Sequence, residues 1–169
     1  MQQHEREPFS AMAQGIRIAQ PADLAWIHTA LVETWGSARI VVNGDIVDAT
    51  RHPCLIAGDN AGLLVFRDHR PDGVEIIAME AFAANKGIGK QLLDHLIRES
   101  TERGKRYISA TTTNDNLPAL RFYQRAGFRV FDLRAGAIDL ARERLKPEIP
   151  ETGCEGIPIR DELELRYPL

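Results

Sequence analysis

Residues 84–90 carry the spacing most suggestive of chemistry, since they read Ala-Asn-Lys-Gly-Ile-Gly-Lys just before a strongly amphipathic stretch. The first backbone N–H groups of a helix have no partner inside it, and the helix dipole adds positive charge, so such a junction suits a phosphate. Gly87 and Gly89 would let a ligand approach the backbone, and Lys90 could add charge. A tight turn between a strand and a helix would need the same glycines, so the segment alone leaves both interpretations open.

Two common phosphate-binding loops do not fit these residues. A dinucleotide-binding Gly-x-Gly-x-x-Gly loop needs a third glycine at position 92, where the chain has Leu92. A P-loop ending at Gly89-Lys90 needs glycine at position 84 and Ser or Thr at position 91, where the chain has Ala84 and Gln91. The sequence therefore excludes both.

A second motif, Asn-x-x-Ala-x-x-Phe-Tyr-x-x-x-Gly-Phe, runs from Asn116 to Phe128. Together with the strand, glycine loop and helix before it, this motif resembles the GNAT family of N-acetyltransferases, most specifically over Glu75–Phe128. The order of elements from Ile16 onward also fits the family. One departure is Ala84, where the family usually carries Arg or Gln. Because the phosphate contacts there are mostly backbone N–H groups, the site can survive this change.

The resemblance implies an α/β (α+β) fold, with a mixed, mostly antiparallel seven-stranded sheet flanked by helices. The fourth and fifth strands, here Val74–Ala81 (bulged near its end) and Tyr107–Thr113, would splay into a V that accepts acetyl-CoA. The pyrophosphate would bind the backbone at 86–90, and the pantetheine arm would pair with the fourth strand. The implied cofactor-binding residues are Met79, Ala81, Lys86, Gly87, Ile88, Gly89, Lys90 and Asn116.

Acetyl transfer to an amine requires a neutral nitrogen, stabilisation of the oxyanion and a proton for the departing thiolate. A lysine-like amine, with a pKa of about 10.4, is protonated at neutral pH, so a base must remove a proton. The resemblance implies that Tyr123 is the acid facing the sulfur, although an aromatic residue at helical spacing also suits the core. Asn116 could cap its helix and also contact the pantetheine arm.

The base is less clearly indicated. Glu75 begins the predicted fourth strand, and some family members carry a catalytic glutamate at a similar place, which makes it a candidate. Glu80, nearer the predicted bulge, is the competing carboxylate, and a solvated strand face would explain either residue. The resemblance places the acceptor site in the regions 35–48 and 135–160. Within them, Trp35 could form a wall, and Arg39 and Arg160 could hold a carboxylate.

The rest of the chain predicts a single domain over residues 15–169, preceded by a mobile polar tail at 1–14. Residues 37–51 are expected to be irregular or briefly helical, and residues 146–158 to form a loop. The hydrophobic spacing predicts helices at 21–35, 88–103, 116–126 and 136–144, and strands at 54–57, 62–67, 74–79, 107–111, 128–133 and 162–167.

Composition narrows the function class further. The formal net charge of −3 argues against broad binding of nucleic acid or membrane surfaces. The five histidines lack metal-ligand spacing, and no apolar run approaches the roughly 20 residues of a membrane span, which favours a metal-free cytoplasmic protein. Neither Cys54 nor Cys154 falls in the expected cleft, which disfavours an acyl-cysteine route.

The resemblance to the GNAT family implies an acetyl-CoA-dependent N-acetyltransferase that works by direct attack in a ternary complex. The alternative is a non-catalytic acyl-CoA-binding or regulatory module on the same fold, because fold does not fix function. The amine acceptor is not indicated, and a homodimer is compatible with the resemblance.

Overall fold

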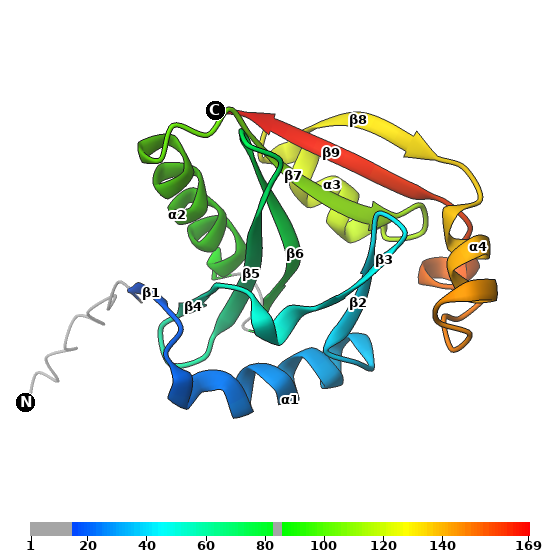
Figure 1. Ribbon diagram of the computed structural model, residues 1–169, viewed down its shortest axis with the longest axis horizontal. Helices are drawn as coiled ribbons and strands as arrows, with labels where there is room; N and C mark the ends of the chain where they lie inside the picture. The colour runs from blue at the N-terminus through cyan, green and yellow to red at the C-terminus, as the bar shows by residue number, and fades with distance from the viewer. Residues whose placement is uncertain (1–14, 83–85) are drawn as a thin grey trace, which may run out of the picture.

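The computed structural model describes residues 15–82 and 86–169 (Figure 1). The tail predicted at 1–14 lies outside the described residues. The strands are β1 (Ile16–Ile18), β2 (Arg39–Val42), β3 (Asp45–Asp48), β4 (Cys54–Ala57), β5 (Gly62–His69), β6 (Gly73–Ala81), β7 (Tyr107–Thr113), β8 (Arg129–Arg134) and β9 (Glu162–Pro168). The helices are α1 (Leu24–Trp35), α2 (Ile88–Glu102), α3 (Leu117–Arg125) and α4 (Ala137–Arg144).

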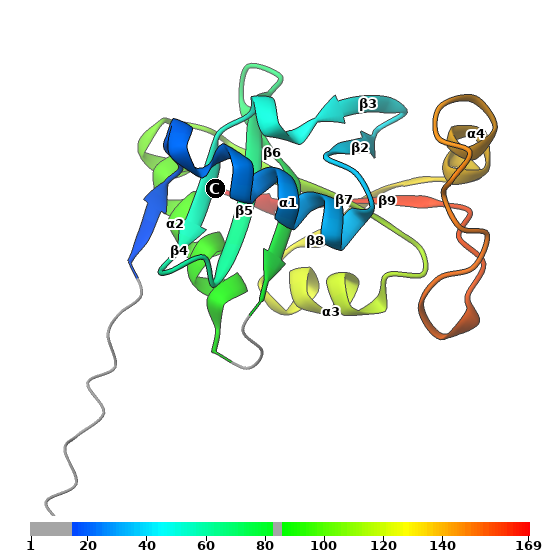
Figure 2. The ribbon, with the colours of Figure 1, turned by 90° about the horizontal axis from the view of Figure 1, so that it is seen from below.

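Seven strands form one mixed sheet in the order β1-β4-β5-β6-β7-β9-β8, which confirms the predicted fold class. Within this sheet, neighbouring strands are antiparallel except for β6 and β7, which run parallel. Alternate residues of the central strands face two separate hydrophobic clusters. One cluster contains α2 and α3, and the other contains α1, which lies across β4, β5 and β6 in Figure 2. The sheet is therefore covered on both faces.

The predicted splay lies between β6 and β7. Their pairing runs from Gly73 opposite Tyr107 to Ile76 opposite Ala110, yet β6 continues to Ala81 and β7 to Thr113. The register of β5 against β6 shifts here, so that Ile77 is the extra residue of a bulge. The bulge lies in the middle of β6 rather than near its end, because a bulge bends its strand and this bend begins where β7 diverges.

The segment 37–51 was predicted wrongly. It forms the β2–β3 hairpin, and only Ala49–Arg51 is a short 3₁₀ turn. Asn43 and Gly44 make the two-residue turn with φ angles of 54° and 80°, the left-handed conformation that an Asn-Gly pair favours in hairpins. Val42 and Val47 then pack into the cluster with α1. The hairpin is thereby fixed beside the point where β6 and β7 separate.

Candidate active site

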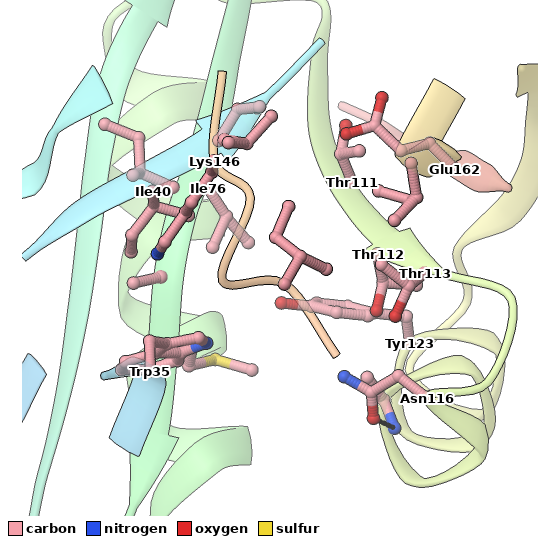
Figure 3. A pocket seen from close by; sticks show the side chains of 18 residues that line it. Trp35, Ile40, Ile76, Thr111, Thr112, Thr113, Asn116, Tyr123, Lys146 and Glu162 are labelled. Carbon is pink, nitrogen blue, oxygen red and sulfur yellow. Dashed lines mark hydrogen bonds between the residues drawn. The ribbon is translucent and has the colours of Figure 1, made fainter. Parts of the chain in front are cut away.

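A cavity of about 270 Å³ lies where β6 and β7 diverge. The walls come from elements that are far apart in the sequence, and Figure 3 draws the 18 lining side chains and labels ten of them. Asn116 lies at one end of the view and Thr111 and Glu162 lie at the other, with Tyr123 between them. The lining residues are Trp35, 40–42, 76–79, 111–113, Asn116, Ala119, Tyr123, Ile138, Lys146, Ile149 and Glu162.

Asn116, at the start of α3 just after β7, and Met79 on β6 both line the cavity. Asn116 caps α3, since its Oδ1 accepts a hydrogen bond from the N–H of Ala119 at 3.2 Å. The amide nitrogen of Asn116 points toward the cleft in Figure 3. Ala81, the other β6 residue predicted to contact the cofactor, pairs with Gly62 and is not among the described residues that line the cavity.

Tyr123 projects from α3 into the cavity and is 7% exposed. Its ring packs between Phe122 and Phe128, with centroid distances of 5.4 and 5.1 Å. Burial raises the pKa of the Tyr123 hydroxyl above its ordinary value. The hydroxyl therefore stays protonated at neutral pH, so that it can donate a hydrogen bond or a proton to a group in the cavity.

The glycine loop leads directly into α2. Gly87 has a φ of 68° and precedes the helix, whose first hydrogen bond runs from the N–H of Gln91 to the carbonyl of Gly87. The preceding N–H groups of Ile88, Gly89 and Lys90 are therefore left without intrahelical partners. A Cβ atom at Gly89 would lie 3.3 Å from the Phe122 ring, which places this helix start against the helix that carries Tyr123.

The glycine loop also contains two lysines and the alanine that departs from the family pattern. Lys86 and Lys90 are exposed, and Lys90 Nζ donates to Asp94 at 2.5 Å. Ala84, the departure from the family pattern, lies outside the described residues.

Glu75, the predicted base, is fully buried and held by two donors. Its Oε2 accepts from Arg67 at 2.6 Å, and its Oε1 accepts from the side-chain amide of Asn43 at 2.5 Å. The Thr111 hydroxyl contacts the same Asn43 amide at 3.4 Å. Glu75 is not among the described residues that line the cavity, so it is connected to the cavity through Asn43 and Thr111. Glu80 is half-buried, accepts from the N–H of Ala81 and also lies outside the lining.

Glu162 was missed as a site residue. It begins β9, is 3% exposed and lines the cavity, and its Oε2 accepts from Arg134 Nε at 3.1 Å. Burial raises the pKa of Glu162, while the Arg134 guanidinium opposes that rise. The polar alternation of Glu162, Glu164 and Arg166 predicts a polar strand face, but sequence alone does not place that face toward the cleft between β6 and β7.

Both regions predicted for the acceptor reach the cavity. Trp35 and the β2 strand form one wall, and residues of α4 and the following loop form another. Arg39 and Arg160 are exposed and not among the described lining residues. Instead, Lys146 lines the cavity, and its Nζ donates to the carbonyl of Arg39 at 3.2 Å.

Other predicted features bear less directly on the cavity. Cys54 is buried on β4, and neither cysteine is among the described lining residues. Within residues 15–82 and 86–169, no group of His, Cys, Asp and Glu is arranged to hold a metal ion. The described helices include none with the length and apolar character needed to cross a bilayer.

Comparison with known proteins supports a family assignment. Residues 22–128 match the model of the acetyltransferase (GNAT) family. The uncharacterized protein YxbD of Bacillus subtilis (strain 168) is 39% identical over 135 residues, which cover 78% of this chain and 84% of that protein. The uncharacterized N-acetyltransferase YvbK of the same organism is 39% identical over 93 residues, covering 51% of this chain and 60% of that protein.

Solved structures show the same fold. A Bacillus subtilis acetyltransferase in complex with CoA aligns with a TM-score of 0.66 at 24% identity, covering 91% of this chain and 97% of that one. A GNAT family acetyltransferase from Elizabethkingia anophelis with acetyl-CoA bound aligns with a TM-score of 0.62 at 22% identity, covering 91% and 98%. The likeness extends over the described fold as a whole.

Proposed function

Because the chain belongs to the acetyltransferase (GNAT) family, we propose that it transfers an acetyl group from acetyl-CoA to an amine by direct attack in a ternary complex. The observation that carries this proposal is the cavity between the diverging strands, where Asn116 and Tyr123 meet β6. Related structures were solved with CoA or acetyl-CoA, which supports the choice of donor.

The residues at the start of α2 fit the pyrophosphate of such a donor. The N–H groups of Ile88, Gly89 and Lys90 together with the helix dipole favour an anion, and Lys86 and Lys90 add positive charge. Beyond Ile76, β6 no longer pairs with β7, so its backbone near Met79 and Ala81 can pair with the amide groups of pantetheine. Asn116 can add a side-chain amide donor.

Tyr123 is proposed as the acid. The nitrogen lone pair forms the C–N bond with the acetyl carbonyl carbon, and the C–S bond breaks with its electron pair leaving on the sulfur. The sulfur then takes the proton of the Tyr123 hydroxyl, which regains a proton from the acetylated nitrogen through solvent. Burial keeps the Tyr123 hydroxyl protonated, and that hydroxyl donates to the sulfur most strongly once negative charge develops there.

The assignment of Glu75 as the base stays a prediction. A base must reach the proton that it removes, directly or through one water. Arg67 and Asn43 already bind both oxygens of Glu75, which would act on an amine in the cavity only through Asn43 or a relayed proton. The geometry supports a positioning role in which Glu75 fixes Asn43, and through it the hairpin, beside β7.

The direct test measures release of free CoA thiol while the protein is incubated with acetyl-CoA and a panel of amines. We expect thiol release that depends on the amine, together with CoA binding by calorimetry. Binding of CoA without thiol release on any amine would indicate a non-catalytic module. A preference for ATP or NAD over CoA would contradict the assignment of the donor.

A further inference from the structure

The end of the cavity away from Asn116 combines apolar side chains with the Thr111 hydroxyl and two charged groups. Ile40 lies toward this end, Ile138 and Ile149 also belong to the cavity lining, and the charged residues among the described lining are Glu162 and Lys146. The Lys146 ammonium is bound to the carbonyl of Arg39, as described above. Glu162 is therefore the negative group available to a molecule in this part of the cavity.

Among the described side chains, Arg134 is the donor to Glu162, and it binds one of the two carboxylate oxygens. From β8, Arg134 binds Oε2, and the same guanidinium binds Glu164 of β9 at 3.3 Å. From β6, the charge of Glu75 raises the pKa of Glu162, and from the hairpin the backbone N–H of Asn43 lowers it. No described side chain donates a hydrogen bond to Glu162 Oε1. The pair with Arg134 thus orients the carboxylate without using both oxygens.

We propose that Glu162 binds the ammonium group of the acceptor and takes its proton, and that the acceptor is a primary amine on a compact apolar body. This inference rests on the acetyl transfer proposed above and adds the acceptor class and the base. The proton passes from the ammonium nitrogen to the Glu162 carboxylate, which leaves a neutral nucleophile. Glu162 later releases that proton to water.

Three features of the cavity support this acceptor class. A buried carboxylate offers a cation a strong, charge-assisted hydrogen bond. The isoleucine walls favour an apolar body, and the volume of about 270 Å³, which must also hold the acetyl end of the donor, favours a small one. The Lys146 charge repels a second ammonium group, which disfavours polyamines.

Burial makes Glu162 a better base, since a raised pKa means that the carboxylate holds a proton more strongly once it has taken one. The raised pKa of Glu162 therefore favours transfer of a proton from the ammonium group to the carboxylate, provided that the carboxylate is ionised when the amine binds. Arg134 favours the ionised form and so opposes part of the rise in pKa that burial causes.

The test compares Glu162→Gln with Glu164→Gln. Both residues lie on β9 and bind Arg134, but Glu164 is not among the described lining residues, so its variant controls for loss of the ion pair. The acceptor probe is 2-phenylethylamine, with spermidine and phenylalanine as comparisons. Thiol release is measured from pH 6.5 to 9.5. Binding of 2-phenylethylamine to the CoA-bound protein is measured separately by calorimetry.

We expect wild type to acetylate 2-phenylethylamine in preference to spermidine and phenylalanine. Glu162→Gln should lower kcat/KM by about 10²-fold at neutral pH, with the deficit shrinking as pH rises and more amine is neutral, whereas Glu164→Gln should stay within about 3-fold of wild type. Calorimetry should show weaker binding of the amine to Glu162→Gln and unchanged binding of CoA.

Two results would overturn the inference while leaving the proposed acetyl transfer in place. One is an equal effect of the two substitutions at every pH, and the other is efficient transfer to spermidine or phenylalanine with none to 2-phenylethylamine. If no amine releases thiol but 2-phenylethylamine binds in a way that depends on Glu162, the binding site stands and the catalytic proposal fails.

Discussion

Glu75 and Glu162 occupy similar environments at the two sides of the V. Each is a buried glutamate on a sheet strand, and each is paired with an arginine of a neighbouring strand, Arg67 or Arg134. Glu75 has both oxygens bound and lies behind the cavity wall, while Glu162 lines the cavity and has one oxygen bound by a described side chain. The comparison indicates that a buried glutamate holds neighbouring elements together at Glu75, whereas at Glu162 it faces the cavity.

The largest expected effect follows from removing the partner of Glu75. Arg67→Met would leave a buried carboxylate without its cation, and we expect the free energy of unfolding to fall by about 3 kcal/mol or more, as measured by urea denaturation. The double variant Arg67→Met/Glu75→Gln should recover much of that loss, because the uncompensated charge is gone. A loss below about 1 kcal/mol in the single variant would show that Glu75 is not held as a structural ion pair.

Tyr123 lines the same cavity as Glu162. Removing the Tyr123 hydroxyl should affect chemistry rather than folding. Tyr123→Phe keeps the ring between Phe122 and Phe128, so we expect kcat to fall by about 10²-fold with little change in CoA binding. An acyl donor with a more acidic thiol should rescue the variant more than wild type, since that leaving group needs a proton less.

The pKa of Tyr123 gives this prediction a pH dependence. Burial raises that pKa, so wild type should keep its Tyr123-dependent rate up to about pH 10 rather than lose it by ionisation. Unchanged turnover in Tyr123→Phe when chemistry is rate-limiting, with an unchanged melting temperature, would assign the residue to core packing.

A smaller effect is expected at the start of α2, a region that contains neither Glu75 nor Glu162. Lys90→Glu places a negative charge on an exposed residue beside the helix N-terminus, and CoA should bind about tenfold more weakly, or about 1.4 kcal/mol by calorimetry. Lys90→Gln should give an intermediate affinity. This pair is preferable to a change at Gly89, where a Cβ atom would press on Phe122. An unchanged affinity would place the pyrophosphate elsewhere.

The smallest effect is expected where Glu75 connects to the hairpin. Asn43→Gly keeps the left-handed turn but removes the amide that bridges Glu75 and Thr111. We expect KM for the amine to rise by about 3-fold, or about 0.65 kcal/mol, with kcat retained, because the hairpin wall is positioned less firmly while glycine keeps the backbone N–H that faces Glu162. A fall in kcat with unchanged KM would indicate that the Glu75–Asn43 pair participates in the chemistry.

Much of the part of the cleft that is proposed to bind acetyl-CoA could be predicted from residues that lie close together in the sequence. The Asn-to-Phe motif at 116–128 places a capping asparagine and a tyrosine on one helix, and the glycine loop before α2 is recognised in the same way. Such features depend on residues close together in the chain. The mixed sheet and the splay follow from the family resemblance, since spacing alone does not show which strands diverge.

The acceptor end could not be predicted because it is assembled from distant segments. Glu162 and Lys146 reach the cavity only after β9 inserts between β7 and β8 and the loop after α4 returns to the hairpin. Asn43-Gly44 was a usable signal for that hairpin, since this pair is the strongest short-range indication of a two-residue turn. The position of Glu75 at the start of a strand does not reveal its ion pair with Arg67, because that pair depends on the register of β5 against β6.

The most direct test of the account compares Glu75→Gln and Glu162→Gln side by side. Each folded variant is incubated with acetyl-CoA and 2-phenylethylamine at neutral pH, and the N-acetylated amine is quantified by mass spectrometry. We expect a product yield near that of wild type for Glu75→Gln and a yield lower by about 10²-fold for Glu162→Gln. A near-complete loss in Glu75→Gln with a wild-type yield in Glu162→Gln would contradict it and place the base on β6.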